Sequence, residues 1–131
     1  MKAFRRAGTN LHYSVDGDLG APALVFSNSL GTDFRIWDQV VERLPRDLQF
    51  VRYDKRGHGL SDVGETPWGM ADHVADLAGL LDHLNVQDAV ICGLSVGGMI
   101  TLGLAAERPD LVKAMLLCDT GAKIGTPDMW Q

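Results

Sequence analysis

Residues 89–99 read AVICGLSVGGM, and their pattern indicates the architecture of the whole chain. An apolar run leads into Gly93, Ser95 follows two residues later, and small and apolar residues then continue to Pro109, where a helix has to end. Residues 93–97 fit the pattern G-x-S-x-G, in which glycines on both sides of a strained turn let a strand and a helix approach each other closely. We therefore predict a strand, a sharp turn and a helix, with Ser95 standing clear of the sheet edge.

The rest of the chain alternates between strands and helices. The N-terminal residues predict an antiparallel hairpin, and apolar runs bounded by turn residues predict parallel strands after it. The hairpin is expected at residues 4–7 and 11–15 with a turn at 8–10, and the parallel strands at 23–27, 49–54, 90–94 and 113–119. Helices between the parallel strands would cover both faces of the sheet. The sequence thus predicts an α/β fold with a mostly parallel sheet.

Two helices are predicted besides the one that follows Ser95. The first begins at Asp33, which suits an N-cap, and ends before Pro45. Its apolar face is expected to contain Ile36, Trp37, Val40, Val41 and Leu44. The second covers residues 70–85, where apolar residues recur at helical spacing. Its opposite face is expected to carry Asp72, Asp76 and His83.

The composition is that of an acidic globular protein. Of the 131 residues, 46% are hydrophobic and 22% are charged, and the formal net charge is −5. An acidic surface argues against nucleic-acid and anionic-membrane partners, and no apolar run resembles a membrane span or a secretory signal. We therefore expect a cytoplasmic protein. Cys92 and Cys118 form neither a C-x-x-C motif nor a Cys/His cluster, so we expect buried free thiols and no metal site.

Ser95 becomes a good nucleophile only if an adjacent base accepts its proton and a third group orients that base. The chain contains four histidines, His12, His58, His73 and His83, of which His58, between two glycines, is the least unsuitable as the base. On this kind of turn the residue order is serine, acid, histidine, so we expect the base beyond residue 131. Asp119, at the end of the last strand, is one candidate for the acid, and a carboxylate further along is preferred.

Two backbone groups are expected to stabilise the negative charge that develops on the substrate oxygen. One is the N–H of Val96, directly after Ser95 and at the start of a helix. The other is the N–H of Leu30, in the loop after the strand at residues 23–27. Because both donors belong to the backbone, the identity of either side chain matters little.

These residues resemble the α/β-hydrolases, and within them the 3-oxoadipate enol-lactonases of the β-ketoadipate pathway. Residues 93–97 match the nucleophile elbow, and residues 54–61, DKRGHGLS, look like the D-x-R-G-H-G-x-S loop of the superfamily, whose histidine is structural. The segments FSNSLGTD at 26–33 and AKIGTPDMW at 122–130 are more specific, and both are similar to enol-lactonases. Asp119 and Gly121 depart from the family pattern, where Asn and Ala are expected.

The resemblance implies a reaction in which Ser95 attacks a lactone carbonyl and the ring oxygen leaves as an enolate. Water then releases the acyl-enzyme, and no cofactor is needed. A cation or helix N-terminus should bind the substrate carboxylate, for which Lys123 is a weak candidate. The alternatives are a generic carboxylesterase, a C–C hydrolase or a perhydrolase on the same scaffold, or a non-catalytic hydrolase-like receptor that keeps the pocket for a ligand.

The last predicted strand is apolar on both faces and would be a bare hydrophobic edge. We therefore expect residues 1–119 to be the N-terminal part of a hydrolase core and residues 120–131 to begin the connection to a cap domain. The catalytic histidine and the preferred acid would then lie in a C-terminal remainder, in the same or a companion chain. On this interpretation the chain alone would be inactive.

Overall fold

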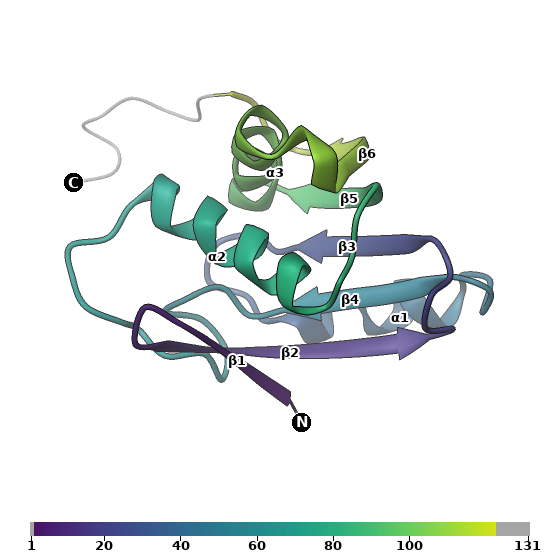
Figure 1. Ribbon diagram of the computed structural model, residues 1–131, viewed down its shortest axis with the longest axis horizontal. Coiled ribbons are helices and arrows are strands. Elements are labelled where there is room, and N and C mark those ends of the chain that lie inside the picture. The colour runs from purple at the N-terminus through teal and green to yellow at the C-terminus, as the bar shows by residue number, and fades with distance from the viewer. Residues whose placement is uncertain (1, 123–131) are drawn as a thin grey trace.

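The computed structural model describes residues 2–122, which form one mixed sheet with helices packed on it (Figure 1). The strands are β1 (Lys2–Arg6), β2 (Thr9–Gly17), β3 (Ala23–Ser27), β4 (Gln49–Tyr53), β5 (Ala89–Leu94) and β6 (Val112–Cys118). The helices are η1 (Phe34–Trp37), α1 (Asp38–Glu42), α2 (Met70–His83), α3 (Val96–Glu107) and η2 (Pro109–Leu111), where η marks a 3₁₀ helix.

The sheet is mostly parallel, as predicted. Its strand order is β1-β2-β4-β3-β5-β6; β2 pairs antiparallel with β1 and β4, and the remaining pairs are parallel. Parallel strands need crossover connections: the η1–α1 segment joins β3 to β4, α2 joins β4 to β5, and α3 joins β5 to β6. The carboxyl ends of β3, β4 and β5 therefore lie at one edge, where the loops at residues 28–33 and 54–62 and the Ser95 turn follow.

Side chains that alternate along the strands build an apolar layer on each face of the sheet. Val25, Val51 and Ile91 contribute to the layer under α2 and α3. Phe26 and Phe50 point to the other face, where they pack with Trp37 and Val41 of the η1–α1 segment. Figure 1 shows α2 and α3 in front of the sheet and α1 behind it, so the prediction of helices on both faces is confirmed.

The N-terminal hairpin turns one residue earlier than predicted. Ala7 and Gly8 occupy the turn with φ values of 47° and 82°, and Thr9 already pairs with Arg6. Positive φ at both central residues matches the twist of the two strands. This tight turn lengthens the second strand at both ends, to Thr9–Gly17.

The helix predicted from residue 33 to residue 44 is divided. Asp33 caps it as expected, accepting a hydrogen bond from the Arg35 N–H, but the first turn is the 3₁₀ helix η1, and α1 contains only five residues. Trp37 and Val41 are buried on the sheet, whereas Ile36 and Val40 are 42% and 41% exposed. Each residue of a helix is rotated about 100° from the one before it, so only one of these two i, i+4 pairs faces the sheet.

The helix α2 carries buried polar groups that the amphipathic pattern did not predict. Asp76, expected on the polar face, is only 1% exposed, and His73 is 8% exposed. The loop after β4 and the strand β1 pack over this side of α2 and bring Arg56 and Arg6 against Asp76. The face is therefore an interface around Asp76, whereas Asp72 is half-buried and His83 is exposed.

The strand β6 is an uncovered edge, in agreement with the sequence pattern. Within residues 2–122 it pairs with β5 alone, and Met115, Leu116 and Leu117 are 38–54% exposed. Cys118 is exposed too, contrary to the expectation of two buried thiols, while Cys92 on β5 is buried. No helix among the described residues is long and apolar enough to cross a membrane.

Candidate active site

Ser95 occupies the turn between β5 and α3 and has a backbone conformation that L-residues rarely adopt. Its φ is 56° and its ψ is −118°. Such strain persists only where surrounding contacts fix it, and it gathers at functional sites. The Ser95 N–H donates to the Cys118 carbonyl at 2.9 Å, and the Ser95 carbonyl accepts from the Gly98 N–H at 2.9 Å and from the Thr120 hydroxyl at 2.6 Å. The turn is therefore held by α3, by the last residue of β6 and by the segment after β6.

Two glycines allow the close packing around this turn. A Cβ placed on Gly93 would lie 2.6 Å from the Gly97 carbonyl oxygen. A Cβ on Gly97 would overlap the Ser27 carbonyl oxygen and lie 2.8 Å from that of Asn28. The start of α3 consequently touches the end of β3, and the G-x-S-x-G spacing has a steric reason at both glycines.

The loop after β3 contains the second predicted donor. Leu30 is 59% exposed, and the loop before it is anchored by Asn28, whose side-chain oxygen accepts from the Trp37 indole N–H at 2.6 Å. Within residues 2–122 neither the Leu30 N–H nor the Val96 N–H donates a hydrogen bond. The described residues therefore provide no acceptor for either N–H group.

The histidines are engaged elsewhere. His12 Nδ1 lies 2.9 Å from an Asp54 carboxylate oxygen, and His58 Nδ1 lies 3.2 Å from the Arg56 carbonyl. Burial, and the positive charge of Lys55, lower the pKa of His73 to about 4. The exposed His83 ring lies 5.0 Å from that of Phe4. In the described part of the chain no hydrogen bond joins any of them to Ser95, and the expectation that the base lies beyond residue 131 stays a prediction.

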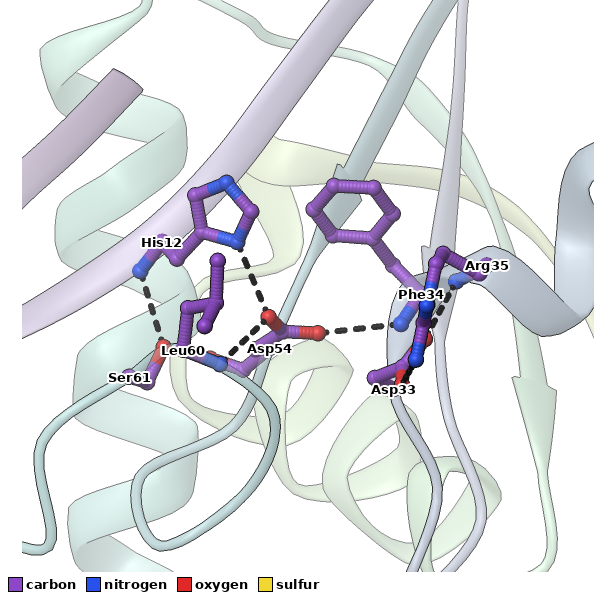
Figure 2. A network of polar contacts seen from close by, with 7 residues as sticks. All are labelled: His12, Asp33, Phe34, Arg35, Asp54, Leu60 and Ser61. Atoms are coloured by element: carbon purple, nitrogen blue, oxygen red, sulfur yellow. Dashed lines mark hydrogen bonds and ion pairs between the residues drawn. The ribbon is translucent and has the colours of Figure 1, made fainter. Parts of the chain in front are cut away.

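Asp54 is the centre of a network that fixes the loop after β4, shown in Figure 2. One carboxylate oxygen accepts from the Phe34 N–H at 2.9 Å, and the other accepts from the Leu60 N–H at 3.1 Å and faces His12. The Ser61 hydroxyl donates to the Asp54 carbonyl and accepts from the His12 N–H. The D-x-R-G-H-G-x-S motif thus joins β2, η1 and this loop.

A cavity of about 540 Å³ lies beside this network. Its lining residues are His12, Asp33, Phe34, Arg35, Asp54, Gly59 and Leu60. Neither Ser95 nor any residue of α3 is among them. This cavity therefore does not locate the site. We place the candidate site at the Ser95 turn, because the backbone there is strained and the N–H groups of Val96 and of Leu30 in the adjoining loop are unused within residues 2–122.

Of the two weaker candidate residues, the structure describes Asp119 but not Lys123. Asp119 follows β6 with a φ of 45° and is exposed, and its neighbour Cys118 accepts the Ser95 N–H. The Asp119 carboxylate makes no hydrogen bond within residues 2–122, so its role stays a prediction. Lys123 lies outside the described residues.

The sequence did not predict two polar residues beside the site, Lys55 and Thr120. Lys55 is 1% exposed, and its ammonium group donates to the Ser29 carbonyl at 2.9 Å. Burial lowers the pKa of Lys55 to about 8. Each contact joins segments 25 or 26 residues apart in the chain, and no local pattern encodes that proximity.

Comparison with known proteins agrees with this architecture. The model of the alpha/beta hydrolase fold family matches residues 22–131. The 3-oxoadipate enol-lactonases 1 and 2 of Acinetobacter baylyi are 40% and 37% identical over 127 and 121 residues, which cover 95% and 92% of this chain. The crystal structure of the enol-lactonase from Burkholderia xenovorans LB400 superimposes with a TM-score of 0.92 at 40% identity and covers 98% of the chain.

The chain belongs to the α/β-hydrolase family, and its relatives support a hydrolase. It spans about half the length of these relatives: 47% and 45% of the two Acinetobacter enzymes and 50% of the Burkholderia chain.

Proposed function

We propose that this chain forms the N-terminal half of a serine hydrolase that opens a small enol-lactone, converting 3-oxoadipate enol-lactone to 3-oxoadipate. The observation that carries the proposal is the strained Ser95 turn at the start of α3, with two unused backbone N–H groups in the segments that meet there. The substrate class rests on the names of the enol-lactonases to which the chain is similar.

In the proposed reaction the Ser95 hydroxyl oxygen attacks the lactone carbonyl carbon while a base accepts its proton. The N–H groups of Val96 and Leu30 bind the oxyanion of the tetrahedral intermediate. The bond from the carbonyl carbon to the ring oxygen then breaks, and the oxygen leaves as an enolate that is protonated to the ketone. Water attacks the acyl-enzyme, which releases the carboxylate and restores the Ser95 hydroxyl.

We infer that the base, and an acid other than Asp119, are supplied by residues C-terminal to this chain. Residues 1–119 would form the first part of the core and residues 120–131 the start of the connection to a cap. The exposed apolar residues of β6 support this arrangement, because further strands there would cover them. The 131-residue chain alone would then lack activity.

The nucleophile can be tested in the complete protein with a fluorophosphonate, which labels activated serines covalently. We expect mass spectrometry to find the label on Ser95, and Ser95→Ala to lose both labelling and lactone hydrolysis. Ser14→Ala is the matched control, because Ser14 lies on β2 and contacts Asp16 at 3.2 Å. Hydrolysis that persists in Ser95→Ala would contradict the proposal.

A further inference from the structure

Lys55 is a buried charged residue near the site, and the proposed reaction gives it no role. It is 1% exposed, and no ion pair engages its ammonium group in the described part of the chain. Lysine is almost never fully buried unless it is paired, because its charge loses hydration. Its hydrogen-bond acceptor there is the Ser29 carbonyl oxygen, at 2.9 Å.

The Ser29 carbonyl and the Leu30 N–H belong to the same peptide group. A peptide group is planar and trans, so its C=O and N–H point in opposite directions and turn together. The Thr32 hydroxyl also donates to the Ser29 oxygen, at 2.8 Å. Two donors on one carbonyl therefore fix the direction of the N–H on the other side of the plane.

The residue before Lys55 holds the other end of the same loop. The Asp54 carboxylate accepts from the Phe34 N–H at 2.9 Å, as Figure 2 shows. Two consecutive residues at the end of β4 thus bind the loop after β3 at residues 29 and 34. Because the Asp54 network fixes the backbone at Lys55, the loop has little freedom to rotate its peptide groups.

We propose that Lys55 is a positioning residue of the oxyanion hole. Its ammonium group orients and polarises the Ser29–Leu30 peptide group, so that the Leu30 N–H is oriented before the substrate binds and donates a stronger hydrogen bond. This inference rests on the proposed function, because it requires the Leu30 N–H to bind the oxyanion. A charged donor makes a stronger hydrogen bond than a neutral one, and hydrogen bonds in a chain polarise one another. A donor oriented in advance stabilises the transition state without reorganisation.

The ammonium group also gives the effect a pH dependence. Burial lowers the pKa of Lys55 to about 8, and the negative charge of Asp54 opposes this shift. Burial, together with the positive charge of Lys55, lowers the pKa of His73, on α2, to about 4, so His73 is neutral near pH 8. The other charged groups that act on His73 are Asp76, Arg56 and His58, and Arg56 pairs with Asp76. Above about pH 8 the amine is neutral, so the polarisation of the Leu30 N–H weakens.

The test uses the complete protein with the variants Lys55→Met, Lys55→Arg and Thr32→Val. We expect Lys55→Met to lower kcat about 10-fold or more, less than the roughly 10²–10³-fold cost of removing an oxyanion donor, with little change in KM. The wild type should lose kcat as the pH rises through about 8. Lys55→Arg, which stays charged, should keep activity without that inflection. Thr32→Val should lose less activity than Lys55→Met and should keep the inflection near pH 8.

Lys2→Met is the matched control, because Lys2 is exposed on β1. It should change neither kcat nor the pH profile, and thermal unfolding should show that each variant is folded. A folded Lys55→Met with wild-type kcat would overturn the inference. If Lys55→Met fails to fold, an inflection near pH 8 that persists in Lys55→Arg would overturn it instead. An active Ser95→Ala would contradict the proposed function itself, whereas an inactive Ser95→Ala beside an unchanged Lys55→Met contradicts this inference alone.

Discussion

At the scale of single residues, the Ser95 turn depends on two glycines, which have no Cβ atom. Gly93 and Gly97 leave space for a neighbouring carbonyl, and that space lets the end of β3 meet the start of α3. The same contact brings the loop that contains Leu30 close to the N-terminus of α3. A side chain at either glycine would therefore disturb both the fold and the proposed oxyanion hole.

Gly97→Ala should be strongly destabilising in the complete protein. The new Cβ would overlap the Ser27 carbonyl oxygen, which is backbone and cannot move as a flexible side chain does. We expect the free energy of unfolding to fall by about 3 kcal/mol, measured by urea denaturation. Gly69→Ala is the control, since a Cβ there meets nothing within 4 Å; its effect should stay within about 1 kcal/mol. Equal stability of the two variants would refute the steric account.

His73 should make stability depend on pH. Its ring packs edge-on against Trp68, with centroids 4.9 Å apart, and burial lowers its pKa to about 4 from a usual value near 6.5. Between about pH 4 and pH 6.5 the unfolded state binds more protons than the folded state. The free energy of unfolding therefore decreases as the pH falls from 6.5 to 4. The loss attributable to His73 should reach about 3 kcal/mol.

The measurement is a set of urea unfolding curves from pH 7 to pH 4, together with an NMR titration of the His73 ring. His73→Gln should make the dependence on pH shallower. A ring that titrates near pH 6.5 in the folded protein would contradict this prediction.

At the scale of elements, the loop after β4 is fastened to α2 by a buried ion pair. Arg56 donates two hydrogen bonds to Asp76, at 2.7 and 2.9 Å, and both side chains are at least 94% buried. Arg6 from β1 approaches the same carboxylate at 3.4 Å. The contact therefore joins β1, α2 and the loop that carries Lys55.

Breaking this pair should cost far more than breaking a surface pair on the same helix. Asp76→Asn leaves the Arg56 charge buried without its partner, so we expect a loss of about 3 kcal/mol in the free energy of unfolding. Asp82→Asn is the matched control, because Asp82 also accepts two hydrogen bonds from an arginine, Arg108, but is 50% exposed. Its loss should be below about 1 kcal/mol. Similar losses would show that burial does not set the cost.

These contacts also show how much of the fold and of the candidate site can be predicted from the sequence. The parallel strands and α2 were predicted to within a few residues, because strands buried on both faces and amphipathic helices leave apolar patterns along the chain. The buried charges Asp76 and Lys55 were missed, since each depends on a partner at least 20 residues away. The Ser95 turn is encoded locally by its glycines, whereas Leu30 was assigned from its place in the loop after the strand at residues 23–27, where this kind of turn has its second oxyanion donor.

At the scale of the whole molecule, the described residues form a sheet whose two edge strands differ in charge and in exposed apolar surface. The edge at β1 is a short strand whose residues include Lys2, Arg5 and Arg6, and charged edge strands resist pairing with other chains. The edge at β6 instead exposes three consecutive apolar residues, Met115, Leu116 and Leu117. An apolar edge with unpaired backbone groups favours association.

The 131-residue polypeptide, expressed alone, should therefore self-associate through β6. Leu116, 54% exposed at the middle of this edge, is the position to change: Leu116→Lys should reduce association, because a lysine would bring charge to the pairing surface. Leu19→Lys is the control, since Leu19 is 80% exposed in the turn after β2 and far from β6 in the strand order. Sedimentation velocity over a range of concentrations measures the effect, and the complete protein should show none of it. A 14.2 kDa species that stays monomeric at every concentration would contradict the assignment of β6 as an associating edge.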